Sequence, residues 1–176
     1  MPNYRRAWHP GGTNFFTVNL LQRHNNDLLT RHIGLLRNVV SEVRSRHAFH
    51  IHGWVVLPEH LHCVLELPRN DADFATRWRL IKMNFSKALP KTERRSAVRT
   101  KRGERGIWQR RFWEHLIRDD ADMQAHMDYV HFNPVKHGLV KRVVDWPTST
   151  FHELVKQGVY PQVWGGGHDV LLPYAD

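Results

Sequence analysis

The chain has 176 residues, 41% of them hydrophobic, and its 26 Lys and Arg against 17 Asp and Glu give a formal net charge of +9. This size and hydrophobic content indicate one globular domain, with or without a tail. The single cysteine excludes a disulfide framework and a cysteine-based zinc site within one chain, and it suits a reducing cytoplasm.

The charge and the apolar runs limit the partners of the protein. An excess of basic residues suits a polyanion, and the phosphate backbone of nucleic acid is the commonest one. No apolar run approaches the roughly 20 residues that span a bilayer, and the N-terminal stretch contains no apolar signal segment. We therefore expect a cytoplasmic protein that does not enter a membrane.

Strand and helix patterns alternate along the chain. Runs of β-forming residues predict strands over 13–21, 49–57, 60–67 and about 112–117, and apolar residues at helical spacing predict helices over 26–47, 71–89 and 120–133. The tight turn at Pro58-Glu59 predicts an antiparallel hairpin between the second and third strands. Pro134 is expected to end the last helix.

Two segments fall outside this pattern. Residues 90–106 are rich in Arg, Lys and Gly and predict a mobile basic loop. Residues 146–176 predict a C-terminal extension with a hinge at Gly165-Gly166-Gly167, which leaves 1–145 as the main domain. The order strand, helix, strand, strand, helix, strand, helix predicts an α+β fold of ferredoxin-like type, an antiparallel sheet with helices packed on it.

The stretch "LPEHLHCVLEL" (57–67) places two histidines at the start of a predicted strand. Because side chains alternate on a strand, His60 and His62 share one face, whereas Cys63 points to the apolar face that forms the core. Neutral imidazole binds divalent metals, so the two rings are candidate ligands of one ion. The alternative is a pair of surface histidines in a chain that contains 14.

In "MDYVHFNPVKHGLV" (127–140), Tyr129 and Asn133 are four residues apart and share one face of the predicted helix. Asn133 offers a carbonyl oxygen to a metal, and Tyr129 lies one turn away, placed to attack a phosphate that the metal holds. The alternative is that Tyr129 packs in the core and Asn133 caps the helix before Pro134. Helix spacing alone does not decide between the two.

With these motifs, the chain resembles the REP-associated tyrosine transposases, relatives of the single-tyrosine transposases in the HUH endonuclease superfamily. Each motif is weak alone, and their joint occurrence in one order is specific. The resemblance covers most of the chain and rests on four stretches: "PGGTNFFTV" (10–18), "VVLPEHLHCVLELP" (55–68), "DADFATRWRLIKMNFS" (71–86) and "YVHFNPVKHGLVKRVVDWPTST" (129–150).

The resemblance implies a fold of HUH endonuclease type and a mechanism. In the superfamily, two histidines and one further polar side chain bind Mg²⁺ or Mn²⁺, and the tyrosine attacks a phosphodiester in single-stranded DNA. The products are a 5′-phosphotyrosine link and a free 3′-OH, and a second strand end can then be joined. Carried over by position, His60, His62 and Asn133 are metal ligands and Tyr129 is the nucleophile. The third ligand is often glutamine in transposases of mobile elements, so Asn133 departs from that pattern, and Asn14 stands where an aromatic residue is expected.

The resemblance also implies a substrate, namely repetitive extragenic palindromes (REPs), which fold as hairpins with short single-stranded flanks. Single-stranded DNA requires aromatic side chains beside basic ones, although most aromatic residues in such a chain belong to the core. From the resemblance, this mixture and nearness to the site, the expected DNA contacts are Gly11, Gly12, Thr13, Phe15, Phe16, Arg77, Trp78, Lys82, Arg118 and Lys136.

Two other functions are weighed beside a metal-dependent DNA nickase and strand transferase. One is a catalytically weak module that only binds DNA hairpins. The other is an RNA-binding ferredoxin-like domain, which needs aromatic residues on an open sheet face and no metal. Dimeric relatives pair the tyrosine helix of one subunit with the histidines of another, whereas the long tail here favours a monomer. By resemblance, the protein is expected at the bacterial nucleoid.

Overall fold

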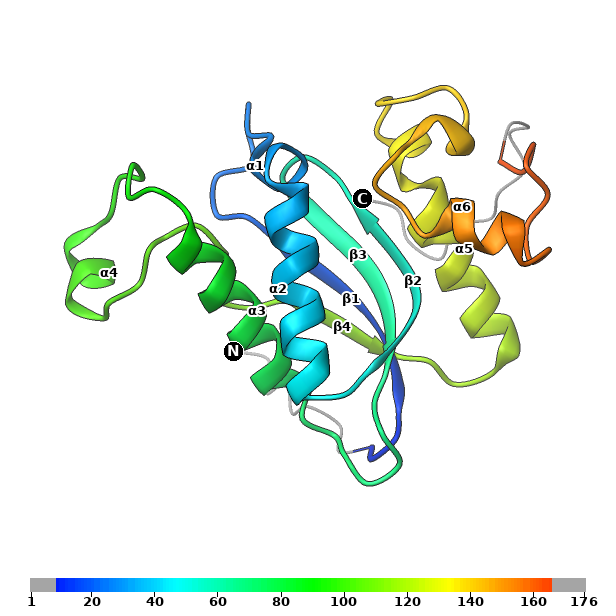
Figure 1. The fold of residues 1–176 in the computed structure, drawn as a ribbon, viewed down its shortest axis with the longest axis horizontal. Coiled ribbons are helices and arrows are strands. Elements are labelled where there is room, and N and C mark those ends of the chain that lie inside the picture. The colour runs from blue at the N-terminus through cyan, green and yellow to red at the C-terminus, as the bar shows by residue number, and fades with distance from the viewer. Residues whose placement is uncertain (1–8, 166–176) are drawn as a thin grey trace, which may run out of the picture.

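A four-stranded antiparallel sheet, in the order β2-β3-β1-β4, forms the centre of the protein, and helices pack on both of its faces (Figure 1). The computed structural model describes residues 9–165. The elements are β1 (Thr13–Asn19), α1 (Leu28–Arg31), α2 (Ile33–Arg46), β2 (His50–Val56), β3 (His60–Glu66), α3 (Phe74–Ala88), α4 (Ala97–Lys101), β4 (Trp113–Leu116), α5 (Asp120–Lys136), the 3₁₀ helix η1 (Val143–Asp145) and α6 (Phe151–Lys156). The predicted α+β class is confirmed. Within the described residues, no helix is long and apolar enough to cross a bilayer.

The predicted hairpin is confirmed, because β2 pairs antiparallel with β3 and the backbone N–H of Leu57 donates to the carbonyl oxygen of His60 at 2.9 Å. Strand β1 pairs antiparallel with the other side of β3. This register places Thr17 opposite His62 and Asn19 opposite His60. Residues far apart in the sequence thereby meet at one end of the sheet.

Each face of the sheet has its own core. Helices α2 and α3 cover one face, where Leu61, Cys63 and Leu65 of β3 are buried with Phe16 of β1. Helix α5 covers the opposite face, where Phe15 and Val64 pack with Met127, Tyr129 and Val130. The prediction that Cys63 points into the core is confirmed. Each large apolar side chain that is fully buried contributes about 1.5–3 kcal/mol.

The helix predicted over 26–47 is divided into α1 and α2 at His32, where φ is −109° and ψ is 33°. Gly34 lies just beyond this break, and glycine disfavours a helix by about 1 kcal/mol relative to alanine. The backbone N–H of Leu29 in α1 donates to the carbonyl oxygen of Pro58 at 3.1 Å. The break thus lets α1 pack at the turn before β3.

The prediction that Pro134 ends the last helix is wrong, since α5 continues to Lys136. Proline lacks one N–H donor, which removes a single backbone hydrogen bond close to the helix end. The carbonyl oxygens of Asn133 and Pro134 still accept from the N–H groups of His137 and Leu139, at 2.9 Å each. This extra turn brings His137 to the same end of the sheet as the β3 histidines.

The basic segment 90–106 is not structureless, because it contains helix α4. The Ser96 hydroxyl caps this helix by accepting from the backbone N–H of Arg99. The Arg105 side chain donates to the Glu93 carboxylate and to the carbonyl oxygens of Leu89 and Pro90. These local bonds, which composition does not reveal, fold the segment.

The chain after η1 adds to the edge of the sheet. The N–H of Val56 donates to the carbonyl oxygen of Thr148, and the N–H of Thr150 donates to that of Trp54, both at 2.9 Å. Phe151 of α6 then packs with Val143 and Tyr160 in a third cluster. Residues 146–165 therefore lie against β2 and α5 (Figure 1). Gly166 and Gly167 of the predicted hinge lie outside the described residues.

Arg77 of α3 is buried and joins three segments. Its guanidinium donates to the carbonyl oxygens of Ala48 and Asp73 and to the Asp71 carboxylate, the last at 2.7 Å. The hydrogen bond from Arg77 holds the pKa of Asp71 below its ordinary value. Arg77 thus links the α2–β2 connection to the start of α3.

Replacing Arg77 by methionine should lower the free energy of unfolding by about 2–3 kcal/mol, because two backbone carbonyls and a carboxylate lose their donor. Urea denaturation of Arg77→Met measures this loss. The matched control is Arg79→Met, which changes an exposed arginine on the same helix and should stay within about 0.5 kcal/mol of wild type. Equal stability of the two variants would contradict the structural role of Arg77.

His131 of α5 fastens the C-terminal segment. Its Nδ1 donates to the carbonyl oxygen of Met127 at 2.8 Å, and its Nε2 contacts Thr150 Oγ1 at 2.9 Å. Burial lowers the pKa of His131 to about 4, so the ring is neutral in the folded protein.

Stability should fall as the pH falls from about 6.5 to about 4. Over that range the unfolded state binds a proton at His131 that the folded state does not, which gives a slope of about 1.4 kcal/mol per pH unit for one histidine. Replacing His131 by glutamine should flatten the dependence of unfolding free energy on pH. His24→Gln, at an exposed histidine, is the control, and an unchanged slope in His131→Gln would refute the expectation.

Candidate functional site

A cavity of about 470 Å³ opens at the end of β3 where the two histidines lie. Side chains from β1, β3, β4 and α5 meet there, so the cavity is assembled from four elements that the sheet and α5 bring together. Its lining residues are Phe15, Thr17, Asn19, Arg23, His60, His62, Trp113, Tyr129 and His137.

The two β3 histidines are oriented by hydrogen bonds behind them. His60 Nδ1 donates to the Glu59 carboxylate at 2.9 Å, and His62 Nδ1 contacts Thr17 Oγ1 at 2.8 Å. Burial raises the pKa of Glu59, but the hydrogen bond to His60, the charge of His60, a backbone hydrogen bond and the hydrogen bond from Arg23 together bring it to about 2. Since ionised Glu59 only accepts, Nε2 is the nitrogen that carries the lone pair in the neutral form of His60.

Helix α5 contributes residues at i, i+4 and i+8, namely Tyr129, Asn133 and the C-cap His137. The Tyr129 ring lies against His62, with centroids 5.2 Å apart, and the Lys136 ammonium stands 4.9 Å from the Tyr129 ring centre. Asn133 Nδ2 donates to the Tyr129 carbonyl oxygen at 3.0 Å. Asp119 caps the N-terminus of the helix, because its carboxylate accepts from the N–H of Asp122 at 2.8 Å.

The donor atoms of this cavity fit a divalent metal ion. One nitrogen from each of His60, His62 and His137 lies within 4.8 Å of the others. His62 Nε2 and Asn133 Oδ1 are buried and have no hydrogen-bond partner among the described residues, although such atoms are normally satisfied. Burial, then the charges of His60 and His137, lower the pKa of His62 well below its ordinary value, and the Asn133 amide beside it opposes this. His62 is therefore neutral, the form that binds metals.

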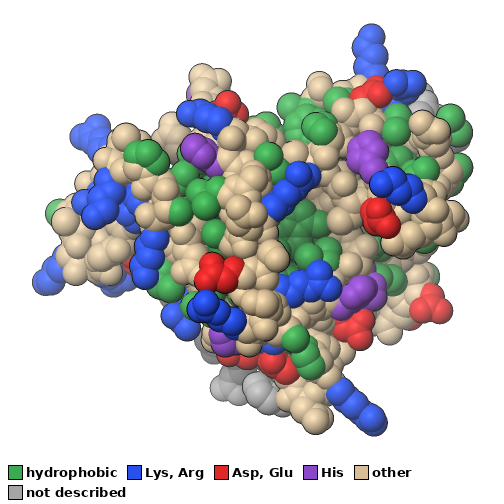
Figure 2. Space-filling model, in the orientation of Figure 1, with side chains coloured by type: hydrophobic (Ala, Val, Ile, Leu, Met, Phe, Trp, Pro, Cys, Tyr) green, Lys and Arg blue, Asp and Glu red, His purple; other side chains and the backbone are tan. Residues whose placement is uncertain are grey.

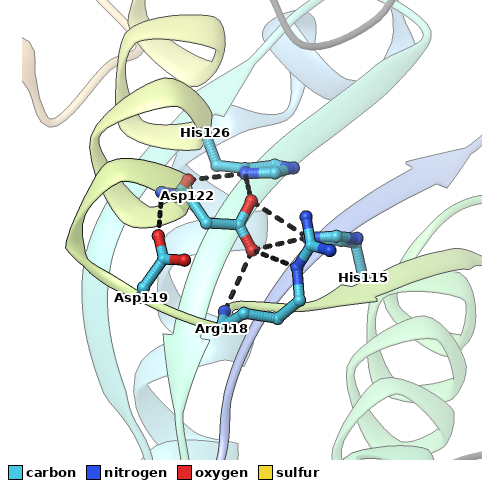
Figure 3. A network of polar contacts seen from close by, with 5 residues as sticks. All are labelled: His115, Arg118, Asp119, Asp122 and His126. Carbon is cyan, nitrogen blue, oxygen red and sulfur yellow. Dashed lines mark hydrogen bonds and ion pairs between the residues drawn. The ribbon is translucent and has the colours of Figure 1, made fainter.

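A polar network behind the cavity joins α5 to β4 (Figure 3). The Asp122 carboxylate accepts from His115 Nε2 at 2.9 Å and from the N–H of Arg118 at 2.9 Å. Burial raises the pKa of Asp122, but these donors bring it to about 2. His126 Nδ1 donates to the Asp122 carbonyl oxygen at 2.7 Å, so this nitrogen offers no lone pair to a metal. The centroid of the His126 ring lies 5.0 Å from that of Phe15. The network positions Phe15, on which His62 and Tyr129 rest.

The residues predicted from sequence to contact DNA fall into separate regions. Phe15 and Lys136 lie at the cavity, and Arg118 belongs to the network behind it. Gly11, Gly12 and Thr13 form the entry to β1, where Gly11 has a φ of +70° and a Cβ would meet the Arg69 backbone at 3.0 Å. Phe16, Arg77 and Trp78 are buried on the α2–α3 side of the sheet, and Lys82 lies over Phe112 beside the basic segment.

Several residues of the cavity were not predicted from sequence. His137 stands one turn after Asn133, so helical spacing would have placed it on the same face as Tyr129 and Asn133. The expectation that the helix ends at Pro134 excluded it. Thr17 meets His62 only through the pairing of β1 with β3, which spans 45 residues of sequence. Trp113, on β4, is 45% exposed at the cavity, and Arg23 lies at its edge.

Three similar proteins identify the family of this chain, although no family model matches it. A REP-associated tyrosine transposase of Escherichia coli is 48% identical over 166 residues, which cover 94% of this chain and 92% of the relative. A putative REP-associated tyrosine transposase of Haemophilus influenzae is 45% identical over 173 residues, 98% of each chain.

A solved structure of a REP-associated tyrosine transposase bound to a REP hairpin is also similar, with a TM-score of 0.80, 43% identity and full coverage of both chains. This likeness confirms the predicted HUH-type fold and the resemblance stated from the motifs. At this identity and coverage, the chain belongs to the REP-associated tyrosine transposases.

Proposed function

We propose that the protein is a single-strand DNA endonuclease and strand transferase that acts on REP-type DNA hairpins through a 5′-phosphotyrosine intermediate. One observation carries the proposal: the Tyr129 ring contacts His62, while His62 Nε2 and Asn133 Oδ1 are buried beside it without partners. The ring of the proposed nucleophile thus lies next to the proposed metal ligands. The hairpin bound in the solved relative supports the choice of substrate. The proposed place of action is the bacterial nucleoid, where such DNA lies.

In the proposed reaction, the Tyr129 hydroxyl oxygen attacks a backbone phosphorus atom and loses its proton. A bond forms between phosphorus and the tyrosine oxygen, and the bond from phosphorus to the 3′ oxygen breaks and leaves a 3′-OH after protonation. The 5′ end stays on Tyr129 until another 3′-OH attacks the same phosphorus atom. Because the phosphotyrosine conserves the energy of the phosphodiester, rejoining needs no nucleotide triphosphate.

The proposed metal ligands are His60, His62 and Asn133, and the closeness of His137 to the two other histidines supports it as a further one. Bound Mg²⁺ or Mn²⁺ would withdraw charge from the scissile phosphate. Glu59 and Thr17 hold two of the imidazoles in place, which is the usual arrangement behind metal-binding histidines. Three nitrogen donors suit Mn²⁺ better than Mg²⁺, since Mg²⁺ prefers oxygen ligands.

A monomer is the proposed active form. Tyr129 and His62 of one chain are in ring contact, so nucleophile and ligands meet without a second subunit. Helix α5 covers strands β2 and β3 on the face of the sheet that carries the histidines. An RNA-binding ferredoxin-like domain needs an open sheet face, so this arrangement disfavours that alternative.

Replacing Tyr129 by phenylalanine should abolish covalent protein–DNA adducts while hairpin binding stays within a few fold of wild type, because the change removes only the nucleophilic oxygen. Adducts are detected by denaturing gel electrophoresis with a labelled hairpin and Mn²⁺. Tyr160→Phe, which removes the hydroxyl that donates to Asp128 in the C-terminal cluster, is the matched control and should still form adducts.

Adduct formation by Tyr129→Phe at the wild-type rate would exclude Tyr129 as nucleophile. Wild-type protein that binds the hairpin tightly and forms no adduct with any divalent ion would favour the alternative of a catalytically weak binding module.

Metal titrations should distinguish the ligands. By isothermal calorimetry, wild type should bind Mn²⁺ more tightly than Mg²⁺. His62→Ala should lose Mn²⁺ binding and DNA cleavage with only a modest loss of hairpin binding. His137→Ala should bind Mn²⁺ about tenfold more weakly than wild type. His24→Ala, at an exposed histidine, is the control. Equal Mn²⁺ affinity in His137→Ala and wild type would remove His137 from the ligand set.

A further inference from the structure

A basic arm, defined as residues 90–112, connects α3 to β4 and includes α4. It contains nine Lys and Arg and two Glu, and so carries +7 of the net charge of +9. In Figure 1 the α4 part of the arm stands apart from the sheet, on the side opposite α5. Figure 2 shows Lys and Arg side chains gathered over this same lobe. Most of the net charge of the protein is thus concentrated in this arm.

The arm uses both of its acidic residues to hold its own shape. Glu93 pairs with Arg105, which also donates to carbonyl oxygens at the end of α3. Glu104 pairs with Arg99 at 3.5 Å and with Arg110 at 3.0 Å. Three arginines therefore build the arm, and its remaining basic residues are available for a partner.

The remaining positive charges point outward. Arg94, Lys101 and Arg102 are exposed, as are Lys91 and Arg95, and the ion pairs found among residues 9–165 do not include them. Between the arm and α3 lies a cavity of about 660 Å³, and its lining adds further cationic side chains from α3: Arg79, Lys82 and Lys87. Such a density of positive charge fits a polyanion.

The aromatic residues of the arm indicate which form of nucleic acid fits. Single-stranded DNA is bound by bases stacked on accessible aromatic rings. Here Trp108 is only 7% exposed, and the Lys82 ammonium stands 5.5 Å from the centre of the partly buried Phe112 ring. A duplex backbone needs only positive charge at phosphate spacing. The arm therefore fits duplex DNA better than an unpaired strand.

We propose that the basic arm binds the phosphate backbone of the duplex stem of the hairpin whose unpaired flank enters the histidine cavity. This inference rests on the proposed function for its DNA substrate. The arm leads directly into β4, and Trp113, the first residue of β4, lines that cavity. The stem and the flank thus have adjoining binding surfaces, and the arm supplies affinity without reading the base sequence.

The test compares two full-length variants of equal net charge. The arm variant combines Arg94→Gln, Lys101→Gln and Arg102→Gln and leaves Arg99, Arg105 and Arg110 in place. The matched control combines Arg31→Gln, Arg46→Gln and Lys156→Gln, at exposed positions outside the arm. Affinity is measured against salt concentration for a synthetic REP-type hairpin with an unpaired flank and for the flank alone, and thermal unfolding verifies that each variant is folded.

The arm variant should lower the slope of log affinity against log salt for the hairpin by about 2–3, since each phosphate contact contributes about 0.9. Its hairpin affinity at 0.1 M salt should fall at least about tenfold, while the control changes little and the flank alone is affected much less. Equal losses in the two variants would overturn the inference, because they would reflect net charge alone. Equal losses for hairpin and flank would also overturn it and assign the arm to the unpaired strand.

The outcome is separable from that of the proposed reaction. If the arm variant lowers the salt slope but wild-type protein forms no covalent adduct, the arm is supported as a stem-binding surface and the proposed reaction is contradicted. If wild-type protein forms adducts but the arm variant keeps the full salt slope, the proposed reaction is supported and the arm inference is contradicted.

Discussion

The antiparallel pairing of β1 with β3 determines which side chains meet at the cavity. Thr17 stands opposite His62 and Asn19 opposite His60 in this register. A slip of one residue in β3 would turn both histidines toward α2 and α3 and would bring Leu61 and Cys63 to the cavity. The burial of Leu61, Cys63 and Leu65 on the far face therefore fixes the direction of the imidazoles. An apolar core holds a polar site in place.

The cavity is maintained at a cost in free energy. A buried polar atom without a partner destabilises the folded state by about 1–3 kcal/mol, and His62 Nε2 and Asn133 Oδ1 are two such atoms. The network around Asp122 shows the opposite arrangement, with each acceptor supplied by Arg118, His115 or its own helix. The contrast between a satisfied network and an unsatisfied cavity, both built on α5, is typical of a site shaped for a ligand rather than for stability.

Local sequence patterns predicted much of this arrangement, because they depend on neighbours in the chain. Strand alternation placed His62 and Cys63 on opposite faces, and helix spacing placed Tyr129 and Asn133 on one face. The family resemblance then predicted that Tyr129 and Asn133 lie near the β3 histidines. Long-range contacts were not readable in the same way. Nothing near Arg77 in sequence reveals the Ala48 carbonyl oxygen that it binds, so its charge, its aromatic neighbour Trp78 and the family resemblance suggested a DNA contact. The fold of the basic arm depends on the pairing of Glu93 with Arg105, which composition does not show.

The short segment Thr148–Thr150 has a consequence for the behaviour of the protein in concentrated solution. A sheet ends in rows of unpaired backbone groups, which can capture a strand from another molecule and begin aggregation. Here the chain itself bonds to Val56 and Trp54 along the outer side of β2, while the opposite border is β4, only four residues long. Neither border leaves a long template for intermolecular pairing. The pairing of this segment with β2 and the shortness of β4 thus limit strand addition by a second copy of the chain.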